Sequence, residues 1–189
     1  MGLRLGLAYP TDTNRASPRF NRGYIAGLGY FRAPFDWLEL GVECDAQALP
    51  TQYVDSVVFE DAANRITLRA KRRAKTGSAL ATARINLVFD RPWTIYVKGG
   101  AGIHKTTISE FFFINNERNG QTADISSVAS GRGLATMAAG GIEAFTNRNV
   151  SLALEARYEE YRLPTSKFTI DSIEFLSYNL GFRYWFGQH

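Results

Sequence analysis

His104 is the first residue of this sequence to suggest chemistry, because Ser109 and Glu110 follow it closely. A histidine, a serine and a carboxylate that converge in space can form a nucleophilic hydrolase site. The linear spacing does not make these three converge, and an isolated histidine among polar residues is usually solvated. The sequence therefore predicts no catalytic residues, and a hydrolase centred on His104 stays open as an alternative.

A second stretch, KGGAGIHKTT, is close to the phosphate-binding pattern G-x-x-x-x-G-K-[ST]. Gly99 and the Lys105–Thr106 pair fit that pattern, but His104 occupies the position of its second glycine. The pattern also needs a helix after it, and this region alternates like a strand. The single cysteine, Cys44, excludes a disulfide framework and a multi-cysteine zinc site. We therefore predict no cofactor and no metal.

Length and composition favour one β-rich domain spanning residues 1–189. Aromatic residues make up 13% of the chain, and 17 glycines stand against 6 prolines. The sequence has no apolar run long enough for a membrane helix. Its first residues, MGLRLGLAYPTD, are too short and too alternating for a secretory signal. If the protein is exported, we expect that a signal was removed or that Met1 was added.

Eight segments alternate between apolar and polar residues with a period of two, which is typical of β-strands. They cover residues 2–9, 23–31, 37–44, 78–89, 93–103, 133–145, 150–160 and 176–186, and the fourth could begin as early as Ile66. Short turns (RAPFD, DRP, TNRN) alternate with longer connections, of which 45–77 and 104–132 are the longest. An even number of strands, each paired with its neighbour in sequence, predicts an up-and-down meander that closes into a barrel.

Alternation alone fits both a soluble barrel with an apolar interior and a membrane barrel with an apolar exterior. The polar faces carry equal numbers of acids and bases, as a closed lumen requires: Arg4, Glu39, Glu43, Arg84, Lys98, Glu143, Glu155, Arg157, Glu159 and Arg183. Glycines fill the rest of these faces, while aromatic residues gather at the ends of the apolar faces, as in bilayer-spanning barrels. We predict an all-β fold: an eight-stranded antiparallel up-and-down transmembrane β-barrel with a polar, charge-paired lumen.

Over nearly its whole length the chain resembles the small eight-stranded outer-membrane barrels of the OmpA, OmpX and opacity-protein group. The segments YVKGGAGI, GGIEAF, NVSLALEARYEEY and NLGFRYWF carry the resemblance. Because the strand number is even, we expect both termini on the short-turn, periplasmic side. The resemblance implies an integral protein of a Gram-negative outer membrane, and it does not include the peptidoglycan-binding domain of the full-length OmpA pattern. It also implies a signal for the barrel assembly machinery at Asn179, Gly181, Tyr184 and Phe186, although GQH follows where such signals usually end.

The net charge of +4 comes from outside the balanced lumen, mainly from the stretch RITLRAKRRAK. We expect its cations to lie in the outer connection 45–77, just beyond the bilayer, where they either are solvated or contact lipopolysaccharide phosphates: Arg69, Lys71, Arg72, Arg73 and Lys75. Similar basic runs occur in nucleic-acid-binding proteins, but we predict no nucleic-acid partner here.

The expected outer connection 104–132 contains an apolar run of four residues: Phe111, Phe112, Phe113 and Ile114. Either the strands continue past the membrane and this run packs on a neighbour, or it forms a sticky surface for a partner.

We therefore predict a non-enzymatic structural or interaction protein of the cell envelope. It would act through its extracellular loops, bind outer-membrane lipid and lipopolysaccharide, and could be a subunit of a larger envelope assembly. A small channel and, less favoured, a lipid A-modifying hydrolase stay open as alternatives.

Overall fold

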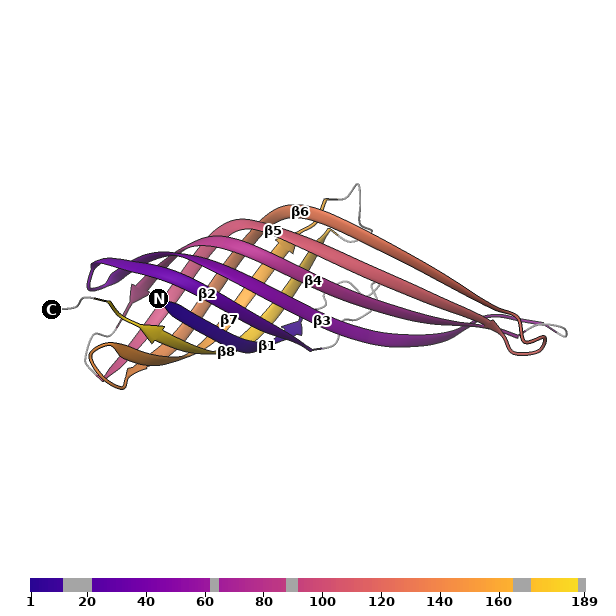
Figure 1. Cartoon of the computed structure of the whole chain (residues 1–189), viewed down its shortest axis with the longest axis horizontal. Coiled ribbons are helices and arrows are strands. Elements are labelled where there is room, and N and C mark those ends of the chain that lie inside the picture. The colour runs from indigo at the N-terminus through magenta and orange to yellow at the C-terminus, as the bar shows by residue number, and fades with distance from the viewer. Residues whose placement is uncertain (12–21, 62–64, 88–91, 165–170, 187–189) are drawn as a thin grey trace.

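A computed structural model describes residues 1–11, 22–61, 65–87, 92–164 and 171–186. Eight antiparallel strands follow one another around a closed barrel, and β1 pairs with β8 to complete it (Figure 1). The strands are β1 (Gly2–Pro10), β2 (Gly23–Phe35), β3 (Leu38–Glu60), β4 (Arg65–Asn86), β5 (Trp93–Asn116), β6 (Thr122–Phe145), β7 (Val150–Arg162) and β8 (Ser172–Tyr184). The predicted eight-stranded up-and-down topology is confirmed.

The barrel is apolar outside and polar inside. Arg84 in the lumen is 1% exposed, whereas Leu154 on the outer surface is 66% exposed. The outward apolar band on β5 runs from Trp93 to Ile103. At the usual rise and tilt of barrel strands this band is about 25 Å tall, which matches the hydrocarbon thickness that such barrels span. The lipid-facing assignment of the apolar face is confirmed.

Four strands continue beyond the barrel as a sheet, which is clear to the right of Figure 1. β3 and β4 stay paired out to Glu60 and Arg65, and β5 and β6 stay paired out to Asn115 and Thr122. We call this sheet, made of the outer parts of β3 to β6, the extension. The prediction of two long loops at 45–77 and 104–132 is therefore wrong, because most residues of both segments belong to strands.

The extension forms because the alternation does not stop at the membrane boundary. On β4, the residues ITLRAKRRA keep apolar or small side chains at Ile66, Leu68 and Ala70, with polar ones between them. Charged residues suit a strand whose outer face meets water, so the density of charge does not by itself indicate a loop.

Met1 and the end of β8 lie at the barrel end opposite the extension, where the β2–β3 and β6–β7 turns also are (Figure 1). The Met1 amino group donates a hydrogen bond to the Tyr184 carbonyl at 2.8 Å. The turn between β2 and β3 is only Asp36 and Trp37 long. At the far tip, Gly120 takes a φ of +72°, which its missing side chain permits. No helix in the described ranges is long and apolar enough to cross a membrane.

Glycines in the lumen make room for one aromatic ring. A Cβ on Gly29 would lie 2.5 Å from Phe31 Cε2, and a Cβ on Gly41 would lie 2.5 Å from Phe31 Cδ1. The Arg183 guanidinium stacks over the same ring, 4.2 Å from its centroid. Phe31 therefore fills the lumen next to the charge network.

Candidate interaction surface and lumen network

Three cations hold two carboxylates in the middle of the lumen. Arg4 Nη1 donates to Glu43 Oε2 at 2.8 Å and to Glu155 Oε1 at 3.1 Å. Lys98 Nζ lies 2.9 Å from Glu43 Oε1 and 2.6 Å from Glu155 Oε2. Arg157 Nη1 donates to Glu43 Oε2 at 2.7 Å. Each carboxylate is thus shared between strands on opposite walls of the barrel.

A second cluster lies nearer the short turns. Arg183 Nη1 donates to Glu39 Oε2 at 2.7 Å and lies 3.5 Å from Glu143 Oε2. Arg84 pairs with both of the same carboxylates, with its Nε 3.4 Å from Glu39 Oε1. All ten charged residues expected in the lumen are buried there, so the charge-paired lumen is confirmed.

The equal balance of acids and bases is wrong, because the sequence reasoning missed Asp45. This residue is 5% exposed and pairs with Arg4 and Arg157. With it, the described residues place six carboxylates and five cations in the lumen. Asp45 falls at the start of the stretch predicted to be a loop. The signal that could have found it is the period of two that continues from Glu39 and Glu43.

An apolar layer fills the outer half of the lumen, toward the extension. It includes Leu49, Leu80, Ile108, Tyr161 and Phe175, all of them buried. Among the charges on the other side of this layer lies a cavity of about 40 Å³, which has room for only a few ordered waters. Side chains rather than solvent thus occupy most of the lumen, as expected for eight strands.

The residues of the expected assembly signal split between the two faces of β8. Asn179 is buried in the lumen, where its amide donates to Ser177 Oγ at 3.0 Å, and Gly181 is on the same face. The rings of Tyr184 and Phe186 point outward and lie 4.7 Å apart, edge to face. The three residues after Phe186 are outside the described part of the chain.

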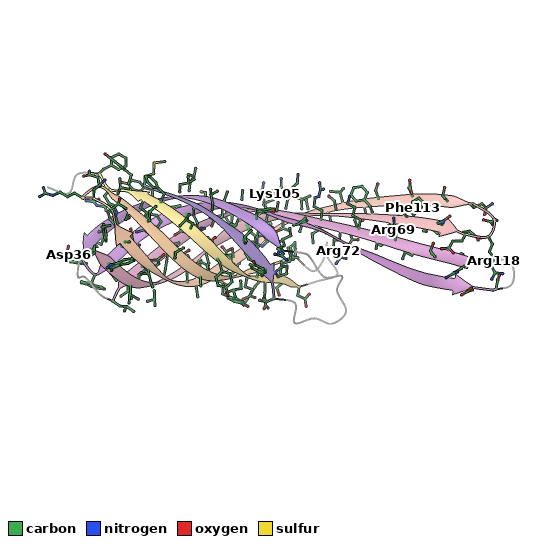
Figure 2. All side chains as sticks on the ribbon, turned by 90° about the horizontal axis from the view of Figure 1, so that it is seen from below. Asp36, Arg69, Arg72, Lys105, Phe113 and Arg118 are labelled. Carbon is green, nitrogen blue, oxygen red and sulfur yellow. The ribbon has the colours of Figure 1, made fainter. Side chains whose placement is uncertain are left out.

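The basic residues of β4 do not form the single loop patch that the sequence predicts. Arg69, Lys71, Arg73 and Lys75 share the outer face of the extension, because they alternate along the strand. Arg72 lies on the opposite face and pairs with Glu110. Figure 2 shows Arg69 and Arg72 along the extension, beyond the end of the barrel.

Two further cations were missed at the junction between the barrel and the extension. Lys105 on β5 lies directly opposite Arg132 on β6, and both are exposed on the outer face. Lys105 is also opposite Gly77, two residues from Lys75 on β4. We call Lys75, Lys105 and Arg132 the rim cations. Figure 2 places Lys105 at this junction.

A groove of about 860 Å³ leads from the rim cations down the outer surface of the barrel. Its floor is made of small residues, including Ala26, Ala46 and Ala48, between Leu5 and Tyr24. Lys75 and Lys105 line its outer end. An apolar trough that ends at two ammonium groups has the form of a site for an acyl chain with an anionic head.

The apolar run 111–114 is divided by strand alternation. Phe111 and Phe113 are 47% and 41% exposed on the outer face, next to Lys71 and Arg69. Phe112 and Ile114 face the other side and are half-buried. The strands thus continue past the barrel, as the first alternative expected, and Phe111 and Phe113 stay exposed.

No protein-family model and no curated protein matches this sequence. Among solved structures, Neisserial surface protein A (NspA) superposes with a TM-score of 0.59 at 12% identity, over 98% of this chain and 96% of that one. This chain has the fold of the small eight-stranded outer-membrane β-barrels. Ail, the attachment invasion locus protein of Yersinia pestis, aligns over 97% of this chain and 95% of its own, at 18% identity and a TM-score of 0.46.

Within this outer-membrane barrel fold, His104 makes structural contacts. It is 3% exposed, with Nδ1 2.9 Å from Thr106 Oγ1 and Nε2 2.8 Å from the Arg162 carbonyl. Its ring stacks on Tyr161. Ser109 is on the opposite face of β5, and Glu110 pairs with Arg72. The three residues that sequence spacing suggested for a hydrolase therefore do not converge.

Proposed function

We propose that the chain is a non-catalytic, integral outer-membrane protein that holds the extension outside the cell and binds lipopolysaccharide at its rim. Both termini and the short turns then lie in the periplasm. Insertion would use the barrel assembly machinery, through the outward aromatic rings at the end of β8. The extension would be the part that meets molecules outside the membrane.

The position of the rim cations carries this proposal. On β5 the outward face is apolar up to Ile103, and the next outward residue is Lys105. On β6 Leu134 is followed outward by Arg132 in the same way. In the proposed placement, these cations lie where the bilayer core gives way to headgroups, at the level of lipid A phosphates. Cations at such a surface each contribute about 1 kcal/mol of attraction.

The basic face of the extension continues this charge outward. Arg69, Lys71 and Arg73 stand above the rim on the same face of the sheet. They are suited to the phosphates and acidic sugars of the lipopolysaccharide core by charge complementarity. We keep the expectation of no nucleic-acid partner.

Phe111 and Phe113 suit contact with an envelope protein. Together with Arg69, Lys71, Asp124 and Ser126 they line a hollow of about 430 Å³ on the outer face of the extension. Exposed aromatic rings beside cations are typical of protein interfaces. The partner would be found by extraction in mild detergent, followed by mass spectrometry of the proteins that remain bound in fixed ratio.

The two alternatives have less support. A channel needs gaps along the lumen, but the apolar layer around Leu80 and Phe175 fills its outer half. A hydrolase needs a nucleophile next to His104, and its two ring nitrogens are already bonded to Thr106 and Arg162. We therefore favour a structural and interaction role.

Lipopolysaccharide binding is tested by a paired substitution at the rim. Lys75→Gln with Lys105→Gln removes two cations without changing the apolar band, and affinity for lipopolysaccharide should fall about 30-fold. The matched control is Arg32→Gln with Arg148→Gln, which removes two exposed cations at the opposite end. Equal losses in both variants, or no loss in either, would contradict a specific site at the rim.

A further inference from the structure

The extension has a strand edge without a neighbour. β6 pairs with β7 only from Ala135 to Phe145. Across the described part of the chain, the outer half of β6, Thr122–Leu134, is therefore paired on one side only, with β5. Such an edge leaves alternate backbone N–H and C=O groups facing water and is a template for pairing with another strand.

The opposite edge of the extension is β3, and its sequence resists pairing. β3 pairs with β2 only as far as Ala48. Pro50 comes two residues later, and Glu60 lies at the end of the strand. Proline and charged residues on an edge are the features by which natural sheets block association.

The β6 edge lacks these features only between Asp124 and Arg132. Ile125–Gly131, with the sequence ISSVASG, contains neither a charge nor a proline. Ile125 is 54% exposed and Val128 is 69% exposed, so apolar side chains accompany the unpaired backbone. This segment therefore contains nothing that blocks pairing with a partner strand.

This edge is complementary to itself in one antiparallel register. When Val128 lies opposite Val128 of a second copy, Asp124 of each copy faces Arg132 of the other. Ser126 then faces Ser130. All five side chains are on the same face of the sheet, because they alternate along the strand.

Asp124 and Arg132 are available for such a contact. Both are exposed, and in the described ranges neither forms an ion pair within its own chain. Arg132 instead has a like charge, Lys105, directly opposite on β5. Like charges opposite each other on adjacent strands are destabilising, and an incoming carboxylate would relieve this one.

We propose that β6 pairs with β6 of a second copy of this chain, antiparallel and centred on Val128. Two extensions then form one continuous eight-stranded sheet with two Asp124–Arg132 ion pairs. The same patch serves on both copies, so the contact closes on itself as a symmetric dimer.

The register sets where the two barrels lie. The extension continues along the barrel axis, as Figures 1 and 2 both show, so two copies in one membrane would have their β6 strands parallel. Antiparallel pairing instead brings together barrels in two apposed membranes, separated by about 35 Å, the length of one extension. This consequence rests on the proposed placement of the extension outside the membrane, whereas the pairing itself does not.

Charge reversal tests the register. In detergent without lipopolysaccharide, we expect the wild type to form dimers in sedimentation, and Asp124→Arg or Arg132→Asp alone to weaken the dimer by about tenfold or more. A mixture of the two variants restores both ion pairs between unlike copies and should dimerise like the wild type. Recovery in the mixture also shows that each variant is folded.

Disulfide formation tests the centre of the contact. In a Cys44→Ala background, Val128→Cys places two thiols opposite each other, within reach of a disulfide. Ser126→Cys should not cross-link to itself, but should cross-link to Ser130→Cys when the two are mixed.

A wild type that stays monomeric at high concentration would overturn the proposal, as would single variants that dimerise normally or cross-linking that is equal at 126 and 128. Because no lipopolysaccharide is present, these results are independent of lipid binding at the rim.

Vesicle clustering tests the placement in apposed membranes. With the protein in two vesicle populations, we expect the wild type to cluster the vesicles and Asp124→Arg not to cluster them. Dimers in detergent without clustering would leave the pairing in place and contradict the placement in apposed membranes.

Discussion

Arg157 Nη2 donates a hydrogen bond to Asp45 Oδ2 at 2.9 Å, although the two residues are 112 positions apart in the chain. Arg157 is on β7 and Asp45 is on β3, strands that are not neighbours in the barrel. Arg4 on β1 reaches the same carboxylate from another wall. This contact therefore ties walls of the barrel together through its interior.

Asp45→Ala should destabilise the folded barrel by about 3 kcal/mol, because it leaves two buried guanidinium groups short of a partner. The measurement is the free energy of unfolding in denaturant, with the folded fraction read from the mobility difference between unboiled and boiled samples on a gel. Asp36→Asn, in the exposed turn at the left of Figure 2, should change the free energy of unfolding little. Equal effects of the two substitutions would show that Asp45 makes no special contribution.

Gly29→Ala should cost about 1–3 kcal/mol of folding free energy, because the new methyl group would meet the Phe31 ring. Combining it with Phe31→Leu should recover part of that loss, and the double-mutant cycle measures the coupling. Gly99→Ala is the matched control, since a Cβ there meets nothing closer than 3.9 Å. Strictly additive effects at positions 29 and 31 would contradict the contact.

Tyr184→Ala with Phe186→Ala should slow insertion by the barrel assembly machinery. The reason is that the outward aromatic rings at the end of the last strand resemble the signal that this machinery recognises. Folding into membranes that contain the machinery can be followed by the gel shift over time. Phe182→Ala with Leu180→Ala removes outward apolar side chains from the same strand, further from its end, and should have a smaller effect. Equal slowing by both pairs would argue against a terminal signal.

His104→Ala should leave the acyl chains of lipid A unchanged in mass spectra of cells that express the protein. The substitution removes contacts to Thr106 and the Arg162 carbonyl, so a modest loss of stability is expected instead. A change in lipid A acylation that depends on His104 would restore the hydrolase alternative.

The barrel could be predicted from the sequence because polar and apolar residues alternate with a period of two along each of its strands. Arg84 and Glu143 alternate with apolar neighbours, so strand number, topology and the direction of each side chain follow from counting. The equal number of acids and bases was a weaker guide, since one more buried carboxylate, Asp45, is accommodated by Arg4 and Arg157.

The extension could not be predicted in the same way. Its strands carry charged residues and aromatic rings on both faces, a pattern that indicates an exposed loop if every strand is assumed to end at the membrane. The separation of Arg72 from Arg73, and of Phe112 from Phe113, appears only once both segments are known to be strands. The rim cations needed the register between β4, β5 and β6, which sequence spacing does not supply.

The central claim is that the extension lies outside the cell and the short turns lie in the periplasm. Labelling of the two opposite ends of the molecule in intact cells tests it most directly. In a Cys44→Ala background, Asn119→Cys lies at the tip of the extension and Asp36→Cys in a short turn at the other end. With a membrane-impermeant maleimide, we predict labelling of position 119 in intact cells and of position 36 only after the outer membrane is permeabilised. Labelling of position 36 but not 119 in intact cells would contradict the account.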